Sequence, residues 1–434
     1  MIKPVTKMFV LLVLVMALGS LSFAQDAKPS GDITLWGWKA AMDPVRSSGV
    51  LDDFKAEYPD INVNIVEYAP TDLYQQLQLA ISSGVGAPDV SMVESSHLAQ
   101  FVDFGGLADL SEQVQPYLTD VNQFKWTQAE QDGKYYAMPW DSGPVVLYYR
   151  RDVFEKAGLP TDPEAVGNLI ATWNDYLTVC QTIQEKTGDP CFAQNKANNF
   201  GRSFEMMLWQ QGLGYYDEQG KVTVDSPQDI ATLEMLGNFW DANVLSDQLE
   251  WTDGWYAELA DPNAPVATIV IAGWMGAFLK DWIAPGTEGK WGVALMPAMN
   301  AGEVRAANDG GSNFVIPDQS KNKDAAWVFT EFMLGQRDTQ LKLFAASDFL
   351  PSLETTYDSP LFKENDPFFG GEKVRELYTE VAKEIPQANI YGPNYSLMNG
   401  YVATAIQKYA TGNMSAADAL AEAATNIRRD TGLQ

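Results

Sequence analysis

The chain has 434 residues, with 57 acidic and 29 basic side chains, a formal charge of -28 and a single histidine. This length suits two domains or one large two-lobed body, and an apolar fraction of 46% indicates a soluble globular protein. The acidic charge argues against nucleic acid as a partner, because phosphates would be repelled. One histidine excludes a metal site built on two histidine ligands.

The first residues are typical of an export signal. Lys3 and Lys7 precede an apolar run over residues 8–18, and Ser22-Phe23-Ala24 has the small-x-small pattern of a cleavage site. We therefore expect residues 1–24 to be removed and the mature protein to be periplasmic or secreted. An uncleaved membrane anchor is the alternative, although the apolar run is short for a bilayer span. No cysteine lies near the cleavage point, so no lipid anchor is expected.

Strands and helices are predicted to alternate after the signal. The expected order is strand, helix, strand, helix, strand over residues 33–36, 50–58, 61–68, 72–83 and 89–93. Such alternation predicts a mostly parallel sheet with helices on both faces. Ligands of these sheets bind beyond the carboxyl ends of the strands. That rule selects Trp36, Trp38 and Lys39 near the end of the first strand and Glu94 after the third.

Three breaks interrupt the pattern later in the chain. In the first, Asp132-Gly133 is a turn signal, residues 139–144 contain two prolines and a glycine, and residues 145–149 are β-prone. An ordinary hairpin and a passage between two lobes fit these residues equally well. The other breaks are at residues 308–313, which contain a Gly-Gly pair, and at 347–352.

The second half of the chain is predicted to be mainly helical. Helices are expected over residues 151–157, 173–187, 200–211, 228–243, 324–334, 339–345 and 395–431, with one beginning at 273, and strands over 267–271, 291–295 and 314–316. Ser415 is a candidate N-cap. Cys180 and Cys191 are the only cysteines, and in an exported protein we expect a disulfide between them. Two isolated thiols are the alternative.

Six stretches, taken together, resemble a known family. They are residues 54–59, 82–90, 133–149, 152–158 with Thr172-Trp173, 310–311 before 314–316, and 323–327 with 332–333. Their order and spacing resemble those of the extracellular solute-binding proteins of carbohydrate ABC importers, relatives of maltose-binding protein. No single stretch is specific, but the set covers nearly all of the mature chain.

The resemblance implies a type II periplasmic binding protein fold of the α/β class, with two lobes, each a sheet flanked by helices. Three hinge crossings would lie at the breaks, and the lobes would close on a sugar. The implied N-terminal lobe holds residues 30–140 plus 313–348, and the C-terminal lobe holds 141–312 plus 349–434. The resemblance also implies delivery of the sugar to the permease subunits of an ABC transporter. We expect a monomer without cofactor or bound metal.

Sugars have flat C–H faces rimmed by hydroxyls, so tryptophan faces and polar side chains are the groups to expect in the site. Four tryptophans are placed where the cleft should be, namely Trp36, Trp38, Trp140 and Trp274. Trp251 and Trp255, in a loop-like stretch over residues 250–256, are second candidates, and Trp209 fits either role. We assign the others to packing, namely Trp126, Trp173, Trp240, Trp282, Trp291 and Trp327.

Polar and glycine candidates lie at strand ends and breaks, namely Lys39, Glu94, Asp141, Asp309, Gly311 and Asn313. Each could instead be a helix cap, a turn former or a solvated side chain. The first break reads Trp-Asp-Ser-Gly over residues 140–143, unlike maltose-binding protein, so maltose specificity does not transfer.

A secreted glycoside-acting enzyme is the main alternative function, because tryptophans and paired carboxylates would suit it too. No carboxylate pair stands out in the sequence, however, and neither a Gly-x-Ser-x-Gly elbow nor a phosphate-binding loop is present. A binder of metal ions or oxyanions fits poorly with 13 tryptophans and one histidine.

Overall fold

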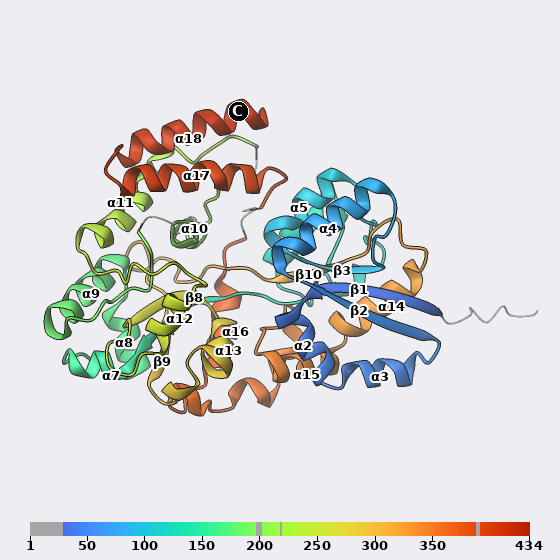
Figure 1. Cartoon of the computed structure of the whole chain (residues 1–434), viewed down its shortest axis with the longest axis horizontal. Helices are drawn as coiled ribbons and strands as arrows, with labels where there is room; N and C mark the ends of the chain where they lie inside the picture. Colours follow the sequence, from blue (N-terminus) through green and yellow to red (C-terminus); the bar gives the residue numbers. More distant parts are fainter. Residues whose placement is uncertain (1–28, 197–201, 218, 388–390) are drawn as a thin grey trace, which may run out of the picture.

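The computed structural model describes residues 29–196, 202–217, 219–387 and 391–434. Two lobes lie side by side, and each has its own sheet and helices (Figure 1). The predicted export signal lies outside the described residues. Within the described part, no helix is both long and apolar enough to cross a bilayer.

The first sheet has five strands, in the order β2-β1-β3-β10-β6. Strand β1 pairs in parallel with β2 and β3, as the alternating pattern predicts, whereas β10 is antiparallel to both β3 and β6. Pro139 lies in the edge strand β6, a position that tolerates a missing N–H. The strands are β1 (Gly31–Trp38), β2 (Ile61–Tyr68), β3 (Val90–Glu94), β6 (Met138–Pro139) and β10 (Ser312–Val315).

Helices cover both faces of this sheet, with α4 and α5 above it in Figure 1 and α2, α3 and α15 below it. Buried apolar side chains from the strands and these helices form one core. The helices of this lobe are α2 (Lys39–Ser47), α3 (Val50–Glu57), α4 (Pro70–Ser83), α5 (Ser95–Phe104), α6 (Gln123–Ala129), α14 (Lys323–Leu334) and α15 (Arg337–Ser347).

The second sheet has three antiparallel strands, with the fully buried β7 in the centre. Its strands are β7 (Val145–Arg150), β8 (Thr268–Ala272) and β9 (Trp291–Leu295). Two clusters of buried apolar side chains surround it. The helices are α7 (Arg151–Lys156), α8 (Pro163–Leu169), α9 (Trp173–Thr187), α10 (Arg202–Trp209), α11 (Pro227–Asp241), α12 (Asp253–Ala260), α13 (Met275–Phe278), α16 (Val374–Glu384), α17 (Tyr395–Ala410) and α18 (Ala416–Thr431).

Shorter elements complete the chain. A π-helical turn, Leu279–Ile283, directly follows α13. The turn signal Asp132-Gly133 joins a small hairpin of β4 (Glu130–Gln131) and β5 (Lys134–Tyr135), with both turn residues at positive φ. Short 3₁₀ turns occupy Gln115–Tyr117, Pro285–Thr287, Glu354–Thr356, Pro360–Lys363 and Pro367–Phe369.

Two stretches for which no helix was predicted are helical. Helix α2 follows β1 without a gap. It contains Pro44, a residue that argues against a helix in the sequence. The stretch over residues 250–256 contains the start of α12, because the Thr252 hydroxyl accepts a hydrogen bond from the backbone of Trp255. The predicted helix over residues 395–431 is two helices, and Ser415 caps the second, as expected.

The three breaks are passages between the lobes, and they lie against one another. The N–H of Trp140 donates to the carbonyl of Ser312 at 2.9 Å, and the N–H of Ser142 donates to the carbonyl of Leu350 at 2.8 Å. The first passage is therefore held between the other two. Of the two interpretations of residues 132–150, the crossing is correct, because the hairpin β4–β5 ends before it and β6 and β7 belong to different sheets.

Gly143 is required where the first and second crossings meet. A Cβ atom at this position would lie 2.0 Å from the carbonyl oxygen of Asp309, which is a steric clash. The N–H of Asp309 donates to the carbonyl of Gly143 at 2.8 Å, and the N–H of Gly143 donates to Oδ1 of Asn308 at 2.9 Å. The glycine thus permits close hydrogen bonding between the two chain segments.

The sulfur atoms of Cys180 and Cys191 form a disulfide, which was one of the two possibilities that the sequence allowed. Cys180 is on α9, and Cys191 follows the turn after that helix. Both residues are buried in the core around the second sheet. The bridge ties the middle of α9 to the segment whose Phe192 forms a β-bridge with Thr268 of β8.

Replacing Cys180 and Cys191 together with serine should lower the free energy of unfolding by about 2 to 3 kcal/mol, because the bridge closes a short loop and restricts the unfolded chain. Urea unfolding of the variant and of the oxidised and reduced wild type would measure this. The reduced wild type should match the variant. Equal stability of all three samples would contradict the prediction.

Candidate functional site

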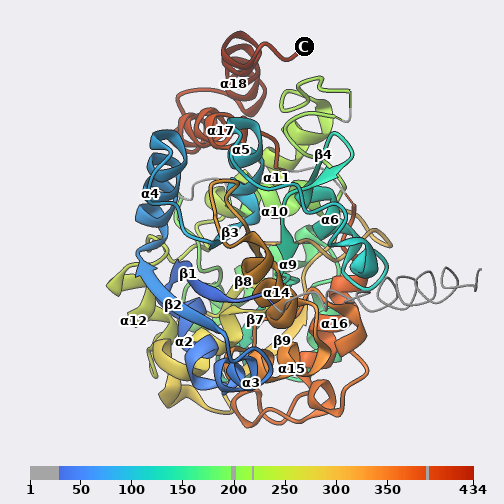
Figure 2. The same cartoon turned by 90° about the vertical axis from the view of Figure 1, so that its right-hand side faces the viewer.

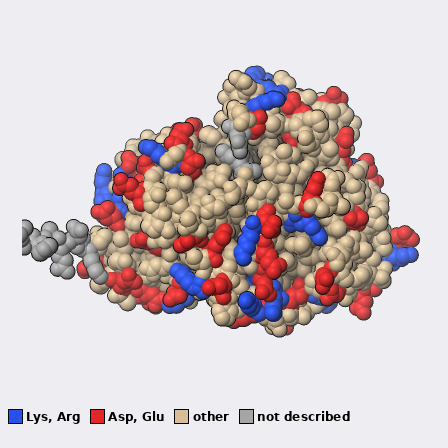
Figure 3. Space-filling view, turned by 180° about the vertical axis from the view of Figure 1, so that it is seen from behind, with Lys and Arg blue, Asp and Glu red and all other residues tan. Residues whose placement is uncertain are grey.

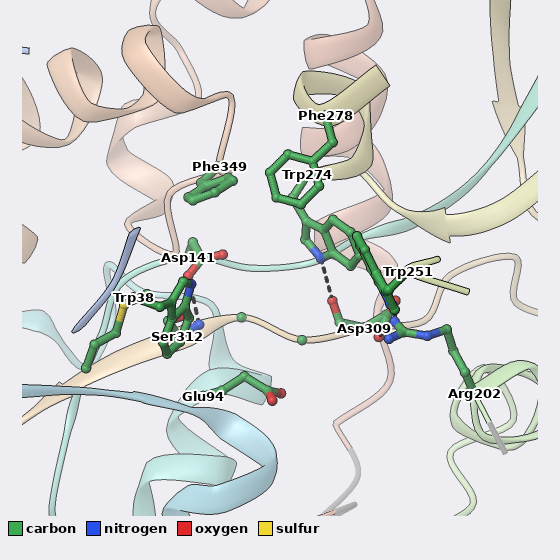
Figure 4. A pocket seen from close by; sticks show the side chains of 13 residues that line it. Trp38, Glu94, Asp141, Arg202, Trp251, Trp274, Phe278, Asp309, Ser312 and Phe349 are labelled. Atoms are coloured by element: carbon green, nitrogen blue, oxygen red, sulfur yellow. Dashed lines mark hydrogen bonds and ion pairs between the residues drawn. The ribbon is translucent and has the colours of Figure 1, made fainter. Parts of the chain in front are cut away.

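A cavity of about 270 Å³, the central cavity, lies between the two sheets beside the crossings (Figure 4). Its walls come from both lobes and combine aromatic rings with charged groups. The residues that line it are Trp38, Met92, Glu94, Asp141, Arg202, Trp251, Trp274, Phe278, Asp309, Gly310, Gly311, Ser312 and Phe349.

A second compartment of about 220 Å³ adjoins the central cavity. Four residues line both spaces, which makes them one continuous cleft, and these are Glu94, Arg202, Trp251 and Asp309. The other residues that line the second compartment are Ser96, Asn195, Glu205, Trp209, Glu250, Tyr391, Tyr395 and Asn399. The cleft is therefore longer than the central cavity alone.

The strand-end rule locates one wall of the central cavity. Trp38 is the last residue of β1 and Glu94 is the last residue of β3. Burial alone would raise the pKa of Glu94, but the charge and hydrogen bonding of His97, with hydrogen bonds from Ser96, lower it. The Ser96 hydroxyl donates to Oε2 of Glu94 at 2.8 Å. Glu94 therefore presents a carboxylate to the cleft.

Aromatic rings form the opposite wall. The rings of Trp251 and Trp274 are stacked, with centroids 5.9 Å apart, and Phe278 lies 5.7 Å from Trp274. The indole N–H of Trp274 donates to the carbonyl of Asp309 at 2.9 Å, which orients the ring (Figure 4). Trp251 has a φ of 64°, which is costly for a bulky residue and is typical of ligand-binding sites.

A charged cluster spans the boundary between the two compartments. Nη1 of Arg202 donates to both carboxylate oxygens of Asp309, at 2.7 and 2.6 Å, and its Nε lies 3.1 Å from Glu250. Burial raises the pKa values of Asp309 and Glu250, while Arg202 opposes the increase. The pKa of Arg202 is raised because these carboxylates outweigh burial. The guanidinium stays charged and keeps both carboxylates in place.

A buried lysine lies behind the central cavity. Nζ of Lys125 donates to the Ser95 hydroxyl at 2.8 Å, and Asp141 accepts from the N–H of Ser312 at 2.7 Å. Burial lowers the pKa of Lys125 to about 8, although Asp141 and Glu94 favour its charged form. A Cβ at Gly311 would lie 2.6 Å from the backbone carbonyl oxygen of Asp141, and the residue has a φ of 91°, so the crossing needs glycine there. Lys125 thus partly offsets the negative charge of the cleft.

Glu205 lies at the far end of the second compartment. Its Oε1 accepts hydrogen bonds from the hydroxyls of Tyr215 and Tyr395, at 2.5 and 2.8 Å, and from Nδ2 of Asn399 at 2.9 Å. Burial raises the pKa of Glu205 to about 7, against the effect of these donors. The carboxyl group can therefore change its protonation state near neutral pH.

Six of the residues selected from the sequence line the cleft together, namely Trp38, Glu94, Asp141, Trp274, Asp309 and Gly311. Their common feature is a position at a strand end, at a crossing or just after a buried strand. Trp251, a second candidate, lines both compartments, and Trp209 lines the second one.

Five selected residues lie elsewhere, and local structure explains each case. Trp36 is buried on one face of the sheet, where its ring packs against that of Tyr68 with the centroids 4.9 Å apart. Lys39 is the first residue of α2, and its exposed side chain forms an ion pair with Asp43.

The other three are buried. Trp140, 1% exposed, packs its ring against Phe314 and Phe349. Trp255 lies on the buried face of α12 and is part of the core. Asn313 is turned away from the cleft because its neighbour Ser312 faces it in an extended strand, and its Nδ2 donates to the Val93 carbonyl.

Sequence reasoning missed the cations and much of the second compartment. Arg202 begins a helix, and Lys125 is on α6 among apolar neighbours, so neither has a local signal. Tyr391, Tyr395 and Asn399 come from the last part of the chain, which folds back against α10 and α11. Among the described residues, no group of His, Cys, Asp and Glu side chains could hold a metal ion.

Glu205→Gln tests the elevated pKa. Because the folded-state pKa of about 7 exceeds the ordinary value of 4.5, the wild type should lose stability relative to the variant as pH rises from 4.5 through 7. The loss should approach about 3 kcal/mol. Urea unfolding of both proteins from pH 4 to 8 measures it, and a pH-independent difference would refute the assignment.

Comparisons with known proteins agree with this architecture. Residues 46–340 match the bacterial extracellular solute-binding protein family. An arabinooligosaccharide-binding protein of Halalkalibacterium halodurans is 27% identical over 389 residues, covering 87% of this chain and 84% of the relative. A lactose-binding protein of Rhizobium radiobacter is 26% identical over 370 residues, covering 84% of each.

Solved structures share the fold. The ABC transporter associated binding protein of B. animalis subsp. lactis, in complex with β-1,6-galactobiose, superimposes with a TM-score of 0.76 at 24% identity, covering 92% of this chain and 97% of the other. The family match extends over more than half of the sequence, and the family is one of binding proteins. The chain therefore belongs to the bacterial extracellular solute-binding proteins, and it is a binding protein rather than an enzyme.

Proposed function

We propose that the protein captures a neutral oligosaccharide in the cleft between its lobes and delivers it to the permease subunits of an ABC transporter. The observation that carries this proposal is the wall of Trp251, Trp274 and Phe278 facing the carboxylates of Glu94, Asp141 and Asp309. Indole faces suit the C–H faces of sugar rings, and carboxylates accept hydrogen bonds from hydroxyls. The relatives named for arabinooligosaccharides and lactose support the same ligand class.

Charge supports a neutral ligand. Among the residues that the structure describes, five acidic side chains but a single basic one line the two compartments, and these are Glu94, Asp141, Glu205, Glu250, Asp309 and Arg202. Acidic groups are also scattered over the surface (Figure 3). An anionic sugar would meet this excess of negative charge at short range and without a free cation, because Arg202 is already paired.

The proposal includes closure of the lobes about the crossings. It assigns residues 30–140 plus 313–348 to the N-terminal lobe and residues 141–312 plus 349–434 to the C-terminal lobe. Strands of the two sheets follow this division, apart from Ser312 at the start of β10. The family is extracellular, and we place this member, processed after residue 24, in the periplasm.

Trp274→Ala should weaken oligosaccharide binding by about 10- to 100-fold, because it removes a central ring from the cleft. The melting temperature of the free protein should change little, since the ring is only partly buried. Titration of lactose, arabinooligosaccharides and β-1,6-galactobiose, followed by intrinsic fluorescence and calorimetry, measures the affinity.

Trp327→Ala is the matched control, since Trp327 is also half-buried but lines neither compartment. If Trp274→Ala kept its affinity for the sugar but lost much of its thermal stability, Trp274 would be a core residue. Chromatography of the same mixtures should show unchanged sugar, and absence of any saccharide binding by the wild type would refute the proposed function.

A uronate-containing oligosaccharide should bind at least about tenfold more weakly than a neutral one of equal length and linkage, because of the negative charge of the cleft. Added salt should reduce this difference in affinity, because it screens the repulsion between the uronate and the acidic side chains. Calorimetry with both ligands at low and high ionic strength tests this. Equal or tighter binding of the uronate would show that the ligand class is wrong.

A further inference from the structure

Arg202 contacts two segments that are far apart in the chain. One is the second crossing, where Nη1 of Arg202 donates to both carboxylate oxygens of Asp309, at 2.7 and 2.6 Å. The other is the segment before α12, where Nε of Arg202 lies 3.1 Å from Oε2 of Glu250. Arg202 is itself the first residue of α10. Three separate parts of the C-terminal lobe therefore meet at one guanidinium.

Each of these two segments also holds one ring of the stacked tryptophan pair (Figure 4). Trp251 directly follows Glu250 in the chain, and the indole N–H of Trp274 donates to the backbone carbonyl of Asp309 at 2.9 Å. The two ring centroids are 5.9 Å apart, and the ring planes form an angle of 29°. Arg202 thus connects the residue before one ring to the residue that orients the other.

Asp309 is the fixed end of this connection. Its N–H donates to the carbonyl of Gly143 at 2.8 Å, so its backbone is held by the first crossing whether or not its carboxylate is paired. Trp274 bonds to that same backbone and therefore does not need Arg202 to keep its orientation. The ring whose position depends on Arg202 is Trp251.

Trp251 has a backbone conformation that needs external support. Its φ of 64° is unfavourable for a bulky side chain and persists only where surrounding contacts oppose relaxation. Its ring packs against Trp255 as well as Trp274 but is still 39% exposed. The Glu250–Arg202 pair fixes the residue immediately before it. Without this pair, we expect Trp251 to relax to a negative φ, which would move its ring off Trp274.

The chemistry of this connection requires arginine. The side chains of Arg202, Glu250 and Asp309 are 27%, 16% and 10% exposed, so water competes only weakly for their hydrogen bonds. A guanidinium has a rigid, planar set of donors that can bind two carboxylates at fixed angles. A lysine ammonium is a point charge on a flexible chain and cannot fix both carboxylates in the same way.

We infer that Arg202 is a positioning residue, which keeps Trp251 stacked on Trp274 before a ligand arrives. It acts through its ion pairs with Glu250 and Asp309. A ring pair that is already formed does not have to be ordered during binding, so less affinity is lost to entropy. The effect of Arg202 on affinity rests on the proposed function, whereas its effect on the ring pair is a property of the free protein.

Circular dichroism of the ligand-free protein tests the ring pair, because stacked indoles give an exciton couplet. Trp274→Phe identifies the part of the couplet that comes from Trp251 and Trp274. Arg202→Lys should lose most of this part. Glu250→Ala should lose it too, and because Arg202 then keeps its pair with Asp309, this variant tests the inference even if Arg202→Lys folds poorly. An unchanged couplet in a folded variant would overturn the inference.

Arg428→Lys is the matched control. Arg428 forms a bidentate pair with Asp225, at 2.9 Å for each bond, and lines neither compartment. Its replacement by lysine removes the same kind of fork from the same lobe. The couplet of the tryptophan pair and the affinity for sugar should both be unchanged.

A double-mutant cycle on sugar affinity tests whether Arg202 acts through Trp251. The ligand is whichever of lactose, arabinooligosaccharides and β-1,6-galactobiose the wild type binds most tightly, titrated by calorimetry. Arg202→Lys alone should weaken binding about tenfold. In a Trp251→Ala background, the same change should weaken it less than about threefold, because the ring that Arg202 positions is gone.

The other outcomes of this cycle separate the inference from the proposed function. Additive losses of affinity would show that Arg202 binds the ligand directly, which would overturn the positioning role and leave the proposed function standing. Loss of the couplet without loss of affinity would overturn it as well. If the wild type binds no sugar, the proposed function fails, while the dichroism of the free protein still decides whether Arg202 holds the ring pair.

Discussion

The hydrogen bonds between the three crossings are the constraint on which the site depends. Each crossing runs from one lobe to the other, and the backbone of Trp140 and Ser142 bonds to the crossing on either side. Because the crossings lie in contact, residues far apart in the chain, such as Asp141 and Asp309, line one cavity. A side chain at Gly143 would separate the first two crossings and displace both carboxylates.

The cleft combines two kinds of wall that suit different parts of a sugar. Its aromatic wall comes from α13 and the segment before α12, while its carboxylates come from strand ends and crossings. Burial makes the carboxylates costly to ionise, and this cost is counteracted by Arg202 at Asp309 and by Lys125 at Asp141. The carboxylates are thus held in place by hydrogen bonds within the protein. Their remaining lone pairs can accept hydrogen bonds from the ligand.

Predictions from the sequence were most accurate where a local pattern is sufficient. Strands β2 and β9 and helix α9 have the predicted bounds, because apolar spacing and β-branched residues reflect burial directly. Predictions failed where a local signal was misleading or was overlooked. Pro44 did not prevent α2, and the Thr252 cap turned a predicted loop into the start of α12.

The same distinction holds for the tryptophans of the site. Trp38 ends β1 and Trp274 follows β8, positions that the strand-end rule connects with ligands, and both line the central cavity. Trp36 was selected by the same rule and Trp140 for its place in the first crossing, but both are buried against other aromatic rings. Trp282, which the sequence assigned to packing, is half exposed, with one side of its ring against Tyr256.

The sequence by itself determined the α/β class and the positions of the three breaks, because these depend on residue type and on spacing along the chain, and the family resemblance implied that the breaks are crossings. Only the tertiary structure decided which rings face the cleft, that Arg202 holds Asp309 and Glu250, and that the tail of the chain supplies Tyr395 and Asn399. The physical reason is that exposure and charge pairing depend on which segments lie next to each other. Those neighbours are distant in sequence and leave no local pattern.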